Sequence, residues 1–302
     1  MTHDELPHAL LSWYSRHARD LPWRQPGTDA WGVLVCEFMA QQTPVLRVAP
    51  VWTEWMQRWP TPSSLAATAT ADVLKAWGNL GYPRRALRLH ECAQVISTTH
   101  DDTVPADFTA LRALPGVGDY TAAAVLAFGH GRRALALDTN IRRVLCRAFD
   151  GTQWPSASIR VAERERMNDV LPDRALVAES NPHPVSPAAA QSIAALMELG
   201  ACVCTTVPRC DACPLMNACT WRAAGYPTSE PQRRPQPFHG TDRQMRGRIM
   251  RTLRESWPHA VPRAQLMTLG EDAAQIERAL TGLIADALVT TRRGGKVSLP
   301  TS

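Results

Sequence analysis

The spacing of apolar residues and of helix-ending residues most restricts what this chain can fold into. Through residues 1–225, apolar segments of roughly ten to eighteen residues end at Gly or Pro, and almost none alternates with a period of two. Strands with one buried face need that alternation, so the pattern predicts a mainly helical body. The expected helices span residues 4–18, 28–40, 44–58, 71–77, 83–99, 107–113, 119–129, 140–148, 158–170 and 187–199.

Length and hydropathy indicate how many domains to expect and argue against a membrane-spanning helix. The chain has 302 residues, of which 45% are hydrophobic, enough for two domains with cores. Its longest apolar run, residues 33–40, contains Glu37 and is shorter than the ~18 residues that a membrane span needs. Residues 1–10 lack the basic start and apolar centre of a secretory signal, so we expect a cytoplasmic protein. The net charge of +5 permits a polyanionic partner.

The C-terminal quarter has a different organisation. Residues 226–237 are rich in proline and polar groups, which predicts a linker. Beyond it we expect helices at 242–257, 263–269 and 272–286, and strands at 288–292 and 297–299 around Gly294 and Gly295. Three helices and a terminal hairpin predict a small winged-helix-like module over residues 238–302. The arginines of its first helix suit either contact with phosphate or a solvated helix face.

Eight cysteines divide into two groups. Cys36, Cys92 and Cys146 each lie alone in an apolar helical segment, as buried free thiols do. The other five lie within eighteen residues, at positions 202, 204, 210, 213 and 219. A reducing cytoplasm argues against disulfides, so this cluster predicts a metal site. Four thiolates, with either Cys202 or Cys204 as the first, suit zinc or an iron-sulfur cluster equally well.

A glycine-rich turn predicts contact with a phosphate backbone. The turn Leu114-Pro115-Gly116-Val117-Gly118 separates two expected helices, and its glycines permit positive φ and a close approach to a ligand. The unpaired amides at the start of the second helix suit a phosphate group. The pattern is typical of a helix-hairpin-helix, which holds DNA without reading bases, and an ordinary turn between two helices is the alternative.

Two carboxyl groups are candidates for catalysis. Glu37 has apolar neighbours on every side of its helix, and burial favours the neutral form of a carboxyl, so we expect it to hold a proton near neutrality. Asp138 stands just before an expected helix, where an ordinary N-cap residue would also stand. A protonated acid beside an ionised aspartate is the arrangement that cleavage of a glycosidic bond needs.

Taken together, these motifs resemble the adenine DNA glycosylases of the helix-hairpin-helix superfamily over about residues 5–222. The resemblance is carried by Leu21-Pro22-Trp23-Arg24, Glu37 with Met39-Ala40-Gln41-Gln42-Thr43, Gly81-Tyr82, the hairpin with Tyr120, Asp138-Thr139-Asn140, Met197-Glu198-Leu199-Gly200-Ala201 and the cysteine set. It implies a helical barrel domain over residues 27–135 and a discontinuous iron-sulfur domain over 1–26 and 136–225. It also implies a [4Fe-4S] cluster rather than zinc, on Cys204, Cys210, Cys213 and Cys219.

The resemblance also implies a role for each matched residue. Glu37 would protonate adenine and Asp138 would stabilise the positive sugar, with Asn140 and Tyr120 orienting the site. Gln42 and Tyr82 would enter the duplex at the opposite base. The hairpin residues Leu114, Gly116, Val117 and Gly118 would hold the DNA backbone, and Trp23 and Arg24 would line the base pocket. Adenine would be flipped out of the helix, because its glycosidic bond is inaccessible in the stack.

The implied activity is removal of adenine mispaired with 8-oxoguanine or guanine in duplex DNA during base excision repair, by a monomer associated with the nucleoid. The related endonuclease III has a catalytic lysine where this chain has Tyr120, so a glycosylase without strand cleavage is favoured. The alternatives are an endonuclease III-like lyase for oxidised pyrimidines and a non-catalytic iron-sulfur DNA-binding regulator. Many relatives end in a larger domain that reads 8-oxoguanine, and residues 238–302 are too short and too helical for it.

Overall fold

The computed structural model describes residues 5–177, 182–229 and 238–301. The chain forms two compact units. The first takes its residues from Met1–Leu34, Ala106–Ala113 and Val117–Arg234, and the second from Val35–Pro105, Leu114–Gly116 and Pro235–Ser302. The predicted linker, residues 226–237, lies mostly outside the described residues.

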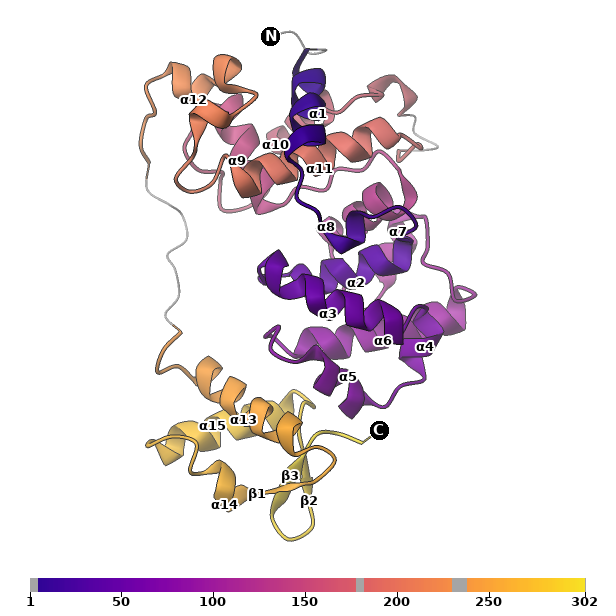
Figure 1. The fold of residues 1–302 in the computed structure, drawn as a ribbon, viewed down its shortest axis with the longest axis vertical. Coiled ribbons are helices and arrows are strands. Elements are labelled where there is room, and N and C mark those ends of the chain that lie inside the picture. The colour runs from indigo at the N-terminus through magenta and orange to yellow at the C-terminus, as the bar shows by residue number, and fades with distance from the viewer. Residues whose placement is uncertain (1–4, 178–181, 230–237, 302) are drawn as a thin grey trace. The chain divides into compact units, whose positions relative to one another are not determined.

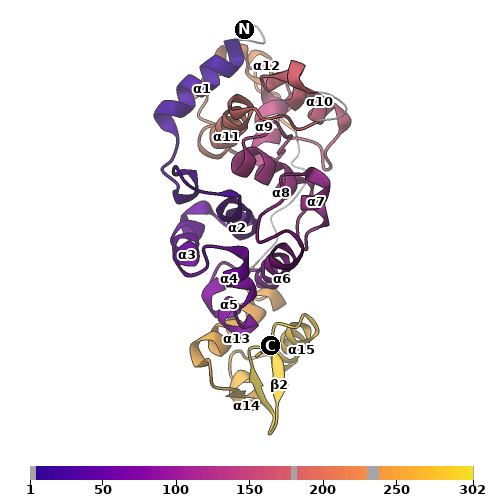
Figure 2. The same ribbon diagram turned by 90° about the vertical axis from the view of Figure 1, so that its right-hand side faces the viewer.

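The first unit is helical. Helix α11 packs against α9 and α1, and both views show the three side by side (Figure 1 and Figure 2). Buried Ala189, Ile193, Leu196 and Leu199 recur every three or four residues on α11, which gives it an apolar stripe for these contacts. The elements of this unit are α1 (Glu5–His17), η1 (Pro22–Arg24), α7 (Phe108–Ala113), α8 (Asp119–Ala124), η2 (Val125–Gly129), α9 (Thr139–Ala148), α10 (Val161–Val170), η3 (Arg174–Leu176), α11 (Pro187–Cys202), η4 (Cys210–Ala212), η5 (Met216–Ala218) and α12 (Thr220–Ala223). Helix α2 (Ala30–Ala40) contributes residues to both units.

The helices before residue 105 in the second unit surround a tryptophan-rich core. Trp55 is fully buried and meets Trp59 and Trp77 edge to face, with ring centroids 4.7 and 5.6 Å apart. Such edge contacts are the favoured geometry for aromatic pairs. Helices α4 and α5 pack against α6. The elements here are α3 (Val45–Arg58), α4 (Pro62–Ala66), α5 (Thr70–Trp77) and α6 (Arg84–Thr99).

Residues 238–301 form a small module within the second unit. Its elements are α13 (Asp242–Ser256), β1 (Val261–Pro262), α14 (Arg263–Leu266), α15 (Ala273–Ala285), β2 (Thr290–Arg292) and β3 (Lys296–Ser298). The antiparallel sheet has the order β1-β3-β2, and Val297 of β3 pairs with Val261 and Thr291. Ile249 and Leu253 of α13 are buried where α13 packs on α15. The expected three helices and terminal hairpin are confirmed, and β1 is a third strand that the sequence did not predict.

The helical prediction is confirmed for the body, with local differences. Helix α4 was not expected, because five residues are too short to show a helical period. The helix expected at 119–129 divides into α8 and the π-helical η2. At its end Gly129 lies against Ala30, where a Cβ atom would fall 2.8 Å from the Ala30 Cα. The helix expected at 187–199 continues to Cys202.

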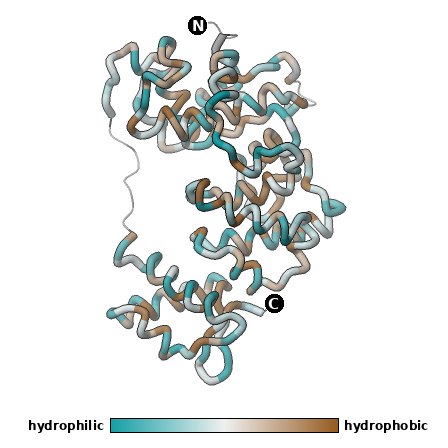
Figure 3. Tube along the Cα trace, viewed as in Figure 1, coloured by the Kyte–Doolittle hydropathy of each residue, from teal (hydrophilic) through white to brown (hydrophobic). Residues whose placement is uncertain are grey.

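Hydropathy along the helices is mixed. Short brown and teal stretches follow one another within single helices (Figure 3). Among the helices that the structure describes, none is long and apolar enough to span a bilayer.

Candidate active site and cysteine loop

Asp138 stands at the beginning of helix α9, in extended conformation. Its Oδ1 accepts a hydrogen bond from the Ile141 amide at 2.7 Å, and its Oδ2 accepts one from Asn140 Nδ2 at 2.7 Å. Asp138 is therefore an N-cap, as one interpretation of the sequence had it. The same two hydrogen bonds fix the orientation of the carboxylate.

Burial raises the pKa of Asp138 above its usual value. The hydrogen bonds from Ile141 and Asn140 and the positive charge of Arg143 oppose this shift without cancelling it. An anion that is incompletely stabilised by its surroundings interacts more strongly with positive charge that develops nearby. This is the electrostatic property that a carboxylate facing a cationic sugar needs.

Arg143 fixes Asn140 in turn. Its Nη2 donates to Asn140 Oδ1 at 2.9 Å and to the Gly200 carbonyl at 2.7 Å, and its Nε donates to the Cys204 carbonyl at 2.7 Å. A Cβ atom on Gly200 would lie 2.6 Å from the Asn140 carbonyl oxygen, so only glycine lets α11 approach α9 this closely. No local pattern assigns a role to Arg143, because two of its acceptors are 57 and 61 residues away in the chain.

Glu198 is a second residue that sequence reasoning left without a role. Its side chain is fully buried on α11, and it accepts hydrogen bonds from Arg19 at 2.7 and 2.8 Å and from Arg24 at 2.9 Å. Burial opposes ionisation, but these arginines outweigh it and hold the pKa of Glu198 at about 2. The structure thus places Arg24, an expected base-pocket residue, on Glu198. Trp23 is half-buried on η1.

Glu37 lies on α2 and is 9% exposed, so its expected burial is confirmed. Its neighbours in the chain, Cys36 and Phe38, are also buried. Tyr120 is the second residue of α8 and is half-buried. Glu37 belongs to the second unit, whereas Asp138 and Tyr120 belong to the first.

One of the two glycines in the glycine-rich turn adopts the positive φ that the sequence led us to expect, whereas Gly118 has a φ of −94°. Gly116 has a φ of +79°, and a Cβ atom there would lie 2.8 Å from Phe38 Cε1, so both conformation and space require glycine. Gly118 caps α8, and a Cβ atom there would meet nothing within 4 Å. Leu114 and Val117 are buried and anchor the turn, which leaves backbone amides at the start of α8 for a phosphate.

Gln42 and Tyr82, the expected duplex contacts, share an uncommon backbone conformation. Their φ values are +54° and +46°, in the left-handed region that residues other than glycine seldom adopt. Both side chains are exposed, Tyr82 by 42%. Strain of this kind is frequent at functional sites, where the surrounding structure enforces it.

Hydrogen bonds from Arg85 hold the backbone beside these two strained residues. Its guanidinium donates to the carbonyls of Phe38 and Met39, at the C-terminal end of α2, at 2.7 and 2.9 Å. It also donates to Thr43 Oγ1 at 2.9 Å and to the Gly81 carbonyl at 3.0 Å. One cation therefore ties the segment after Gln42 to the segment before Tyr82.

Four cysteines of the expected metal site line one small cavity. Cys204, Cys210, Cys213 and Cys219 surround about 30 Å³ of space. Cys202 ends α11, and its Sγ lies 3.6 Å from Glu198 Oε1. Burial raises the pKa of the Cys213 thiol to about 12, and the three other thiols add to the effect. Within the described part of the chain, no three His, Cys, Asp or Glu side chains converge tightly enough to hold a single metal ion.

Residues 203–219 follow α11 and carry the cavity-lining cysteines, and we call them the cysteine loop. Arg147 connects α9 to this loop. It is 1% exposed and lies between the rings of Trp154 and Trp221, at 5.2 and 4.7 Å from their centroids. It donates to the Thr205 carbonyl at 2.7 Å and to Cys204 Sγ at 3.4 Å. Helix α9 thus carries the Asp138 carboxylate at one end and holds the cysteine loop further along.

The three solitary cysteines are buried free thiols, as expected from the sequence. They are Cys36, Cys92 and Cys146.

Comparison with known proteins defines the class. Residues 35–168 match the HhH-GPD superfamily of base excision DNA repair proteins. A thermostable thymine-DNA glycosylase structure superimposes with a TM-score of 0.61 at 23% identity, covering 74% of this chain and 97% of that one. A non-covalent endonuclease III-DNA complex gives 0.59 at 18% identity, covering 74% and 98%. The fold is that of the helix-hairpin-helix DNA glycosylases.

Relatives at higher identity define the family. The adenine DNA glycosylase of Mycobacterium tuberculosis is 51% identical over 96% of this chain and 92% of its own length. That of Mycolicibacterium smegmatis is 49% identical over 97% and 95%. The human adenine DNA glycosylase is 36% identical over 71% of this chain and 39% of its own length. The chain belongs to the adenine DNA glycosylases, which are hydrolases of base excision repair. Coverage of 96% includes most of residues 238–302, so the mycobacterial relatives have a counterpart of this module.

Proposed function

We propose that this enzyme hydrolyses the N-glycosidic bond of adenine paired with 8-oxoguanine or guanine in duplex DNA, and leaves the strand intact. It would act as a monomer on nucleoid DNA in the cytoplasm. The observation that supports this most is the Asp138 carboxylate, which two hydrogen bonds orient at the head of α9.

In this mechanism Glu37 gives its proton to N7 of adenine, which makes the base a neutral leaving group when the bond to the sugar breaks. Asp138 stabilises the positive charge that develops on the sugar, with Asn140 held in place by Arg143. Water adds its hydroxyl to the sugar carbon, and the proton that it loses restores the Glu37 carboxyl. Tyr120 orients the site, and Trp23 and Arg24 line the base pocket.

The DNA contacts follow from the same proposal. Gln42 and Tyr82 enter the duplex at the base opposite the extruded adenine. The turn with Leu114, Gly116, Val117 and Gly118 holds the backbone through its amides. A strand-cleaving lyase needs an amine to form a Schiff base, and the two lysines of the chain, Lys75 and Lys296, lie outside every motif.

We further propose that Cys204, Cys210, Cys213 and Cys219 hold a [4Fe-4S] cluster. Four thiols around one cavity supply the ligand set of such a cluster, in which each thiolate binds a different iron. The cluster would hold the cysteine loop in shape. Residues 1–26 and 136–225 would then form the iron-sulfur domain, and residues 27–135 the helical barrel.

The variant Asp138→Asn tests the reaction. Asparagine is as good an N-cap as aspartate, so we expect a stability change below ~1 kcal/mol. Release of adenine from an A:8-oxoguanine duplex should fall by about 10³-fold, because the negative charge facing the sugar is lost, whereas duplex binding should persist. Unchanged adenine release, or strand breaks in the unaltered protein before alkali treatment, would contradict the proposal. A thymine glycol duplex in the same assay identifies the lyase alternative.

Metal analysis tests the cluster. Protein purified without oxygen should contain about four irons and four sulfides per chain. Cys204→Ser should lose most of this iron, whereas the matched variant Cys202→Ser should retain it, since Cys202 does not line the cavity. Stoichiometric zinc without sulfide would refute the assignment.

A further inference from the structure

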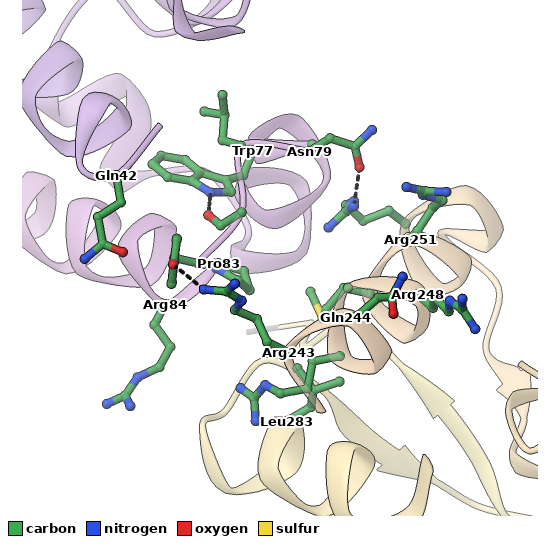
Figure 4. Close-up of a pocket in the computed structure, with 18 of the residues that line it drawn as sticks. Gln42, Trp77, Asn79, Pro83, Arg84, Arg243, Gln244, Arg248, Arg251 and Leu283 are labelled. Carbon is green, nitrogen blue, oxygen red and sulfur yellow. Dashed lines mark hydrogen bonds between the residues drawn. The ribbon is translucent and has the colours of Figure 1, made fainter. Parts of the chain in front are cut away.

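A strongly basic groove lies in the second unit, between the segment 77–84 and helix α13 (Figure 4). Its volume is about 900 Å³. We call it the arginine groove, because arginine supplies every charged residue among the described residues that line it. Its arginines are Arg47, Arg84, Arg243, Arg246, Arg248, Arg251 and Arg254, and Gln42 and Tyr82 also line it.

Among the residues that the structure describes, most of these arginines have no negatively charged partner. Arg84 and Arg246 both pair with Asp286. The other five arginines form no ion pair within the described residues. Their hydrogen bonds go to neutral groups: Arg243 donates to Tyr82 Oη and Arg254 to Asn79 Oδ1, each at 3.0 Å. An accumulation of unpaired guanidinium groups in one groove favours an anionic ligand.

The surface of α13 in the groove has a regular arrangement. Arg243, Gly247, Arg251 and Arg254 are spaced by four, four and three residues, so they share one face of the helix. Gly247 lines the groove between two of these arginines, and a Cβ atom there would meet nothing within 4 Å. Glycine in a helix interior is less favourable than alanine by about 1 kcal/mol. Packing does not require it here, and its absence of a side chain leaves the helix surface open to a bulky chain.

The neighbours of the groove indicate which anion it takes. Gln42 and Tyr82 line the same groove, and Arg243 donates a hydrogen bond to the Tyr82 hydroxyl. A ligand that reaches these two residues passes along α13. Duplex DNA carries a phosphate charge every ~1.7 Å of helix axis, and the guanidinium fork fits phosphate oxygens.

We propose that the arginine groove binds backbone phosphates of duplex DNA beside the mispair, so that the C-terminal module is part of the DNA-binding surface. The position beside the mispair rests on the roles proposed above for Gln42 and Tyr82. Contacts to phosphates position a protein without reading sequence. The groove therefore raises affinity for mispaired and fully paired duplexes alike.

Three substitutions at Gly247 in the full-length protein test this: Gly247→Glu, Gly247→Gln and Gly247→Lys. All three add bulk in open space and improve helix propensity, so each variant should fold, which thermal unfolding checks. The measurement is the Kd for an A:8-oxoguanine duplex and for the fully paired duplex over a range of salt concentrations.

We expect charge to determine the result. Gly247→Glu should weaken binding of both duplexes by about tenfold at low salt and lower the slope of log Kd against log salt by about 1, the effect of losing one phosphate contact. Gly247→Lys should bind at least as tightly as Gly247→Gln. Equal affinities for all three variants, or loss of affinity for only the mispaired duplex, would overturn the proposal.

Together with the adenine-release assay described above, this binding experiment distinguishes failure of the groove proposal from failure of the proposed function. If the unaltered protein releases no adenine but the Gly247 variants follow the order of charge, the proposed substrate is wrong and the groove stands. If adenine is released and the variants bind equally, the groove is wrong and the proposed function stands.

Discussion

Helices α9 and α13 are both rich in arginine, and they use it in opposite ways. Arg143 and Arg147 of α9 are buried, and their guanidinium groups donate to carbonyls of the cysteine loop and the end of α11. Arg243 and Arg251 of α13 are exposed and line a groove to which none of the described residues contributes a carboxylate. The number of arginines on a helix therefore says little about function, whereas the acceptors that surround them distinguish a structural cation from one available to a ligand.

Packing explains the difference. Helix α9 contacts α11, α10 and α12, so most of its circumference is covered and its arginines must find acceptors inside the protein. Helix α13 packs on α15 through Met245, Ile249 and Leu253, which leaves Arg243 and Arg251 on another face to line the groove.

The largest effect on stability should come from Arg147→Met. Methionine fills much of the same volume but leaves the Thr205 and Gln153 carbonyls without their donor, and hydrogen bonds to charged groups contribute about 1.5–3 kcal/mol each. We expect the free energy of unfolding to fall by about 4 kcal/mol in urea titrations. The matched variant Arg251→Met should change it by less than ~0.5 kcal/mol. If both variants lost the same free energy of unfolding, the arginines of α9 and α13 would not differ in their structural role, contrary to this account.

The buried Glu198 carboxylate, paired with half-buried Arg19 and Arg24, should make the first unit sensitive to acid. The pKa of Glu198 is about 2 in the folded protein, below its ordinary 4.5, so its contribution to stability is complete above pH ~5 and is lost as the pH falls toward 2. The shift corresponds to about 3 kcal/mol. Unfolding measured between pH 6 and 2 should show this loss, and Glu198→Gln should show less pH dependence. Parallel curves for the two proteins would contradict this account.

The smallest effect concerns Asp286, a carboxylate that neutralises two arginines of the groove. Asp286 pairs with Arg84 and Arg246, and its side chain is 24% exposed. Partly exposed ion pairs contribute little, so Asp286→Asn should reduce stability by less than ~1 kcal/mol. Because it frees two arginines, it should strengthen duplex binding by about twofold at low salt. Weaker binding would indicate that Asp286 orders the groove rather than opposing its ligand.

Local patterns were sufficient to predict much of the molecule. The helical period located the body, the Gly116 turn was recognised from its residue types, and the apolar neighbours of Glu37 predicted its burial. Strand β1 was not predicted, because a strand of two residues is too short to show the alternation of apolar and polar residues. The spacing of cysteines did not distinguish Cys202 from Cys204. The structure separates them because α11 continues to Cys202 and directs it to Glu198 rather than into the cavity.

Contacts between distant segments were beyond local patterns. Arg85 looks like any surface arginine at the start of a helix, yet its acceptors lie in the segments 38–43 and 80–81. Arg147 is similar, since its acceptor Thr205 is 58 residues away. Such contacts depend on tertiary packing, which the period of a single helix does not encode.

The hydrogen bonds that Arg85 makes to the segments beside Gln42 and Tyr82 affect the expected affinity for DNA. Backbone segments that become ordered only in a complex lose about 1–2 kcal/mol of conformational entropy per residue on binding. At Gln42 and Tyr82 this loss has already occurred during folding, because one guanidinium holds both segments in their left-handed conformation. The two residues that we propose to enter the duplex are thus preorganised, and a larger share of each new contact can appear as affinity.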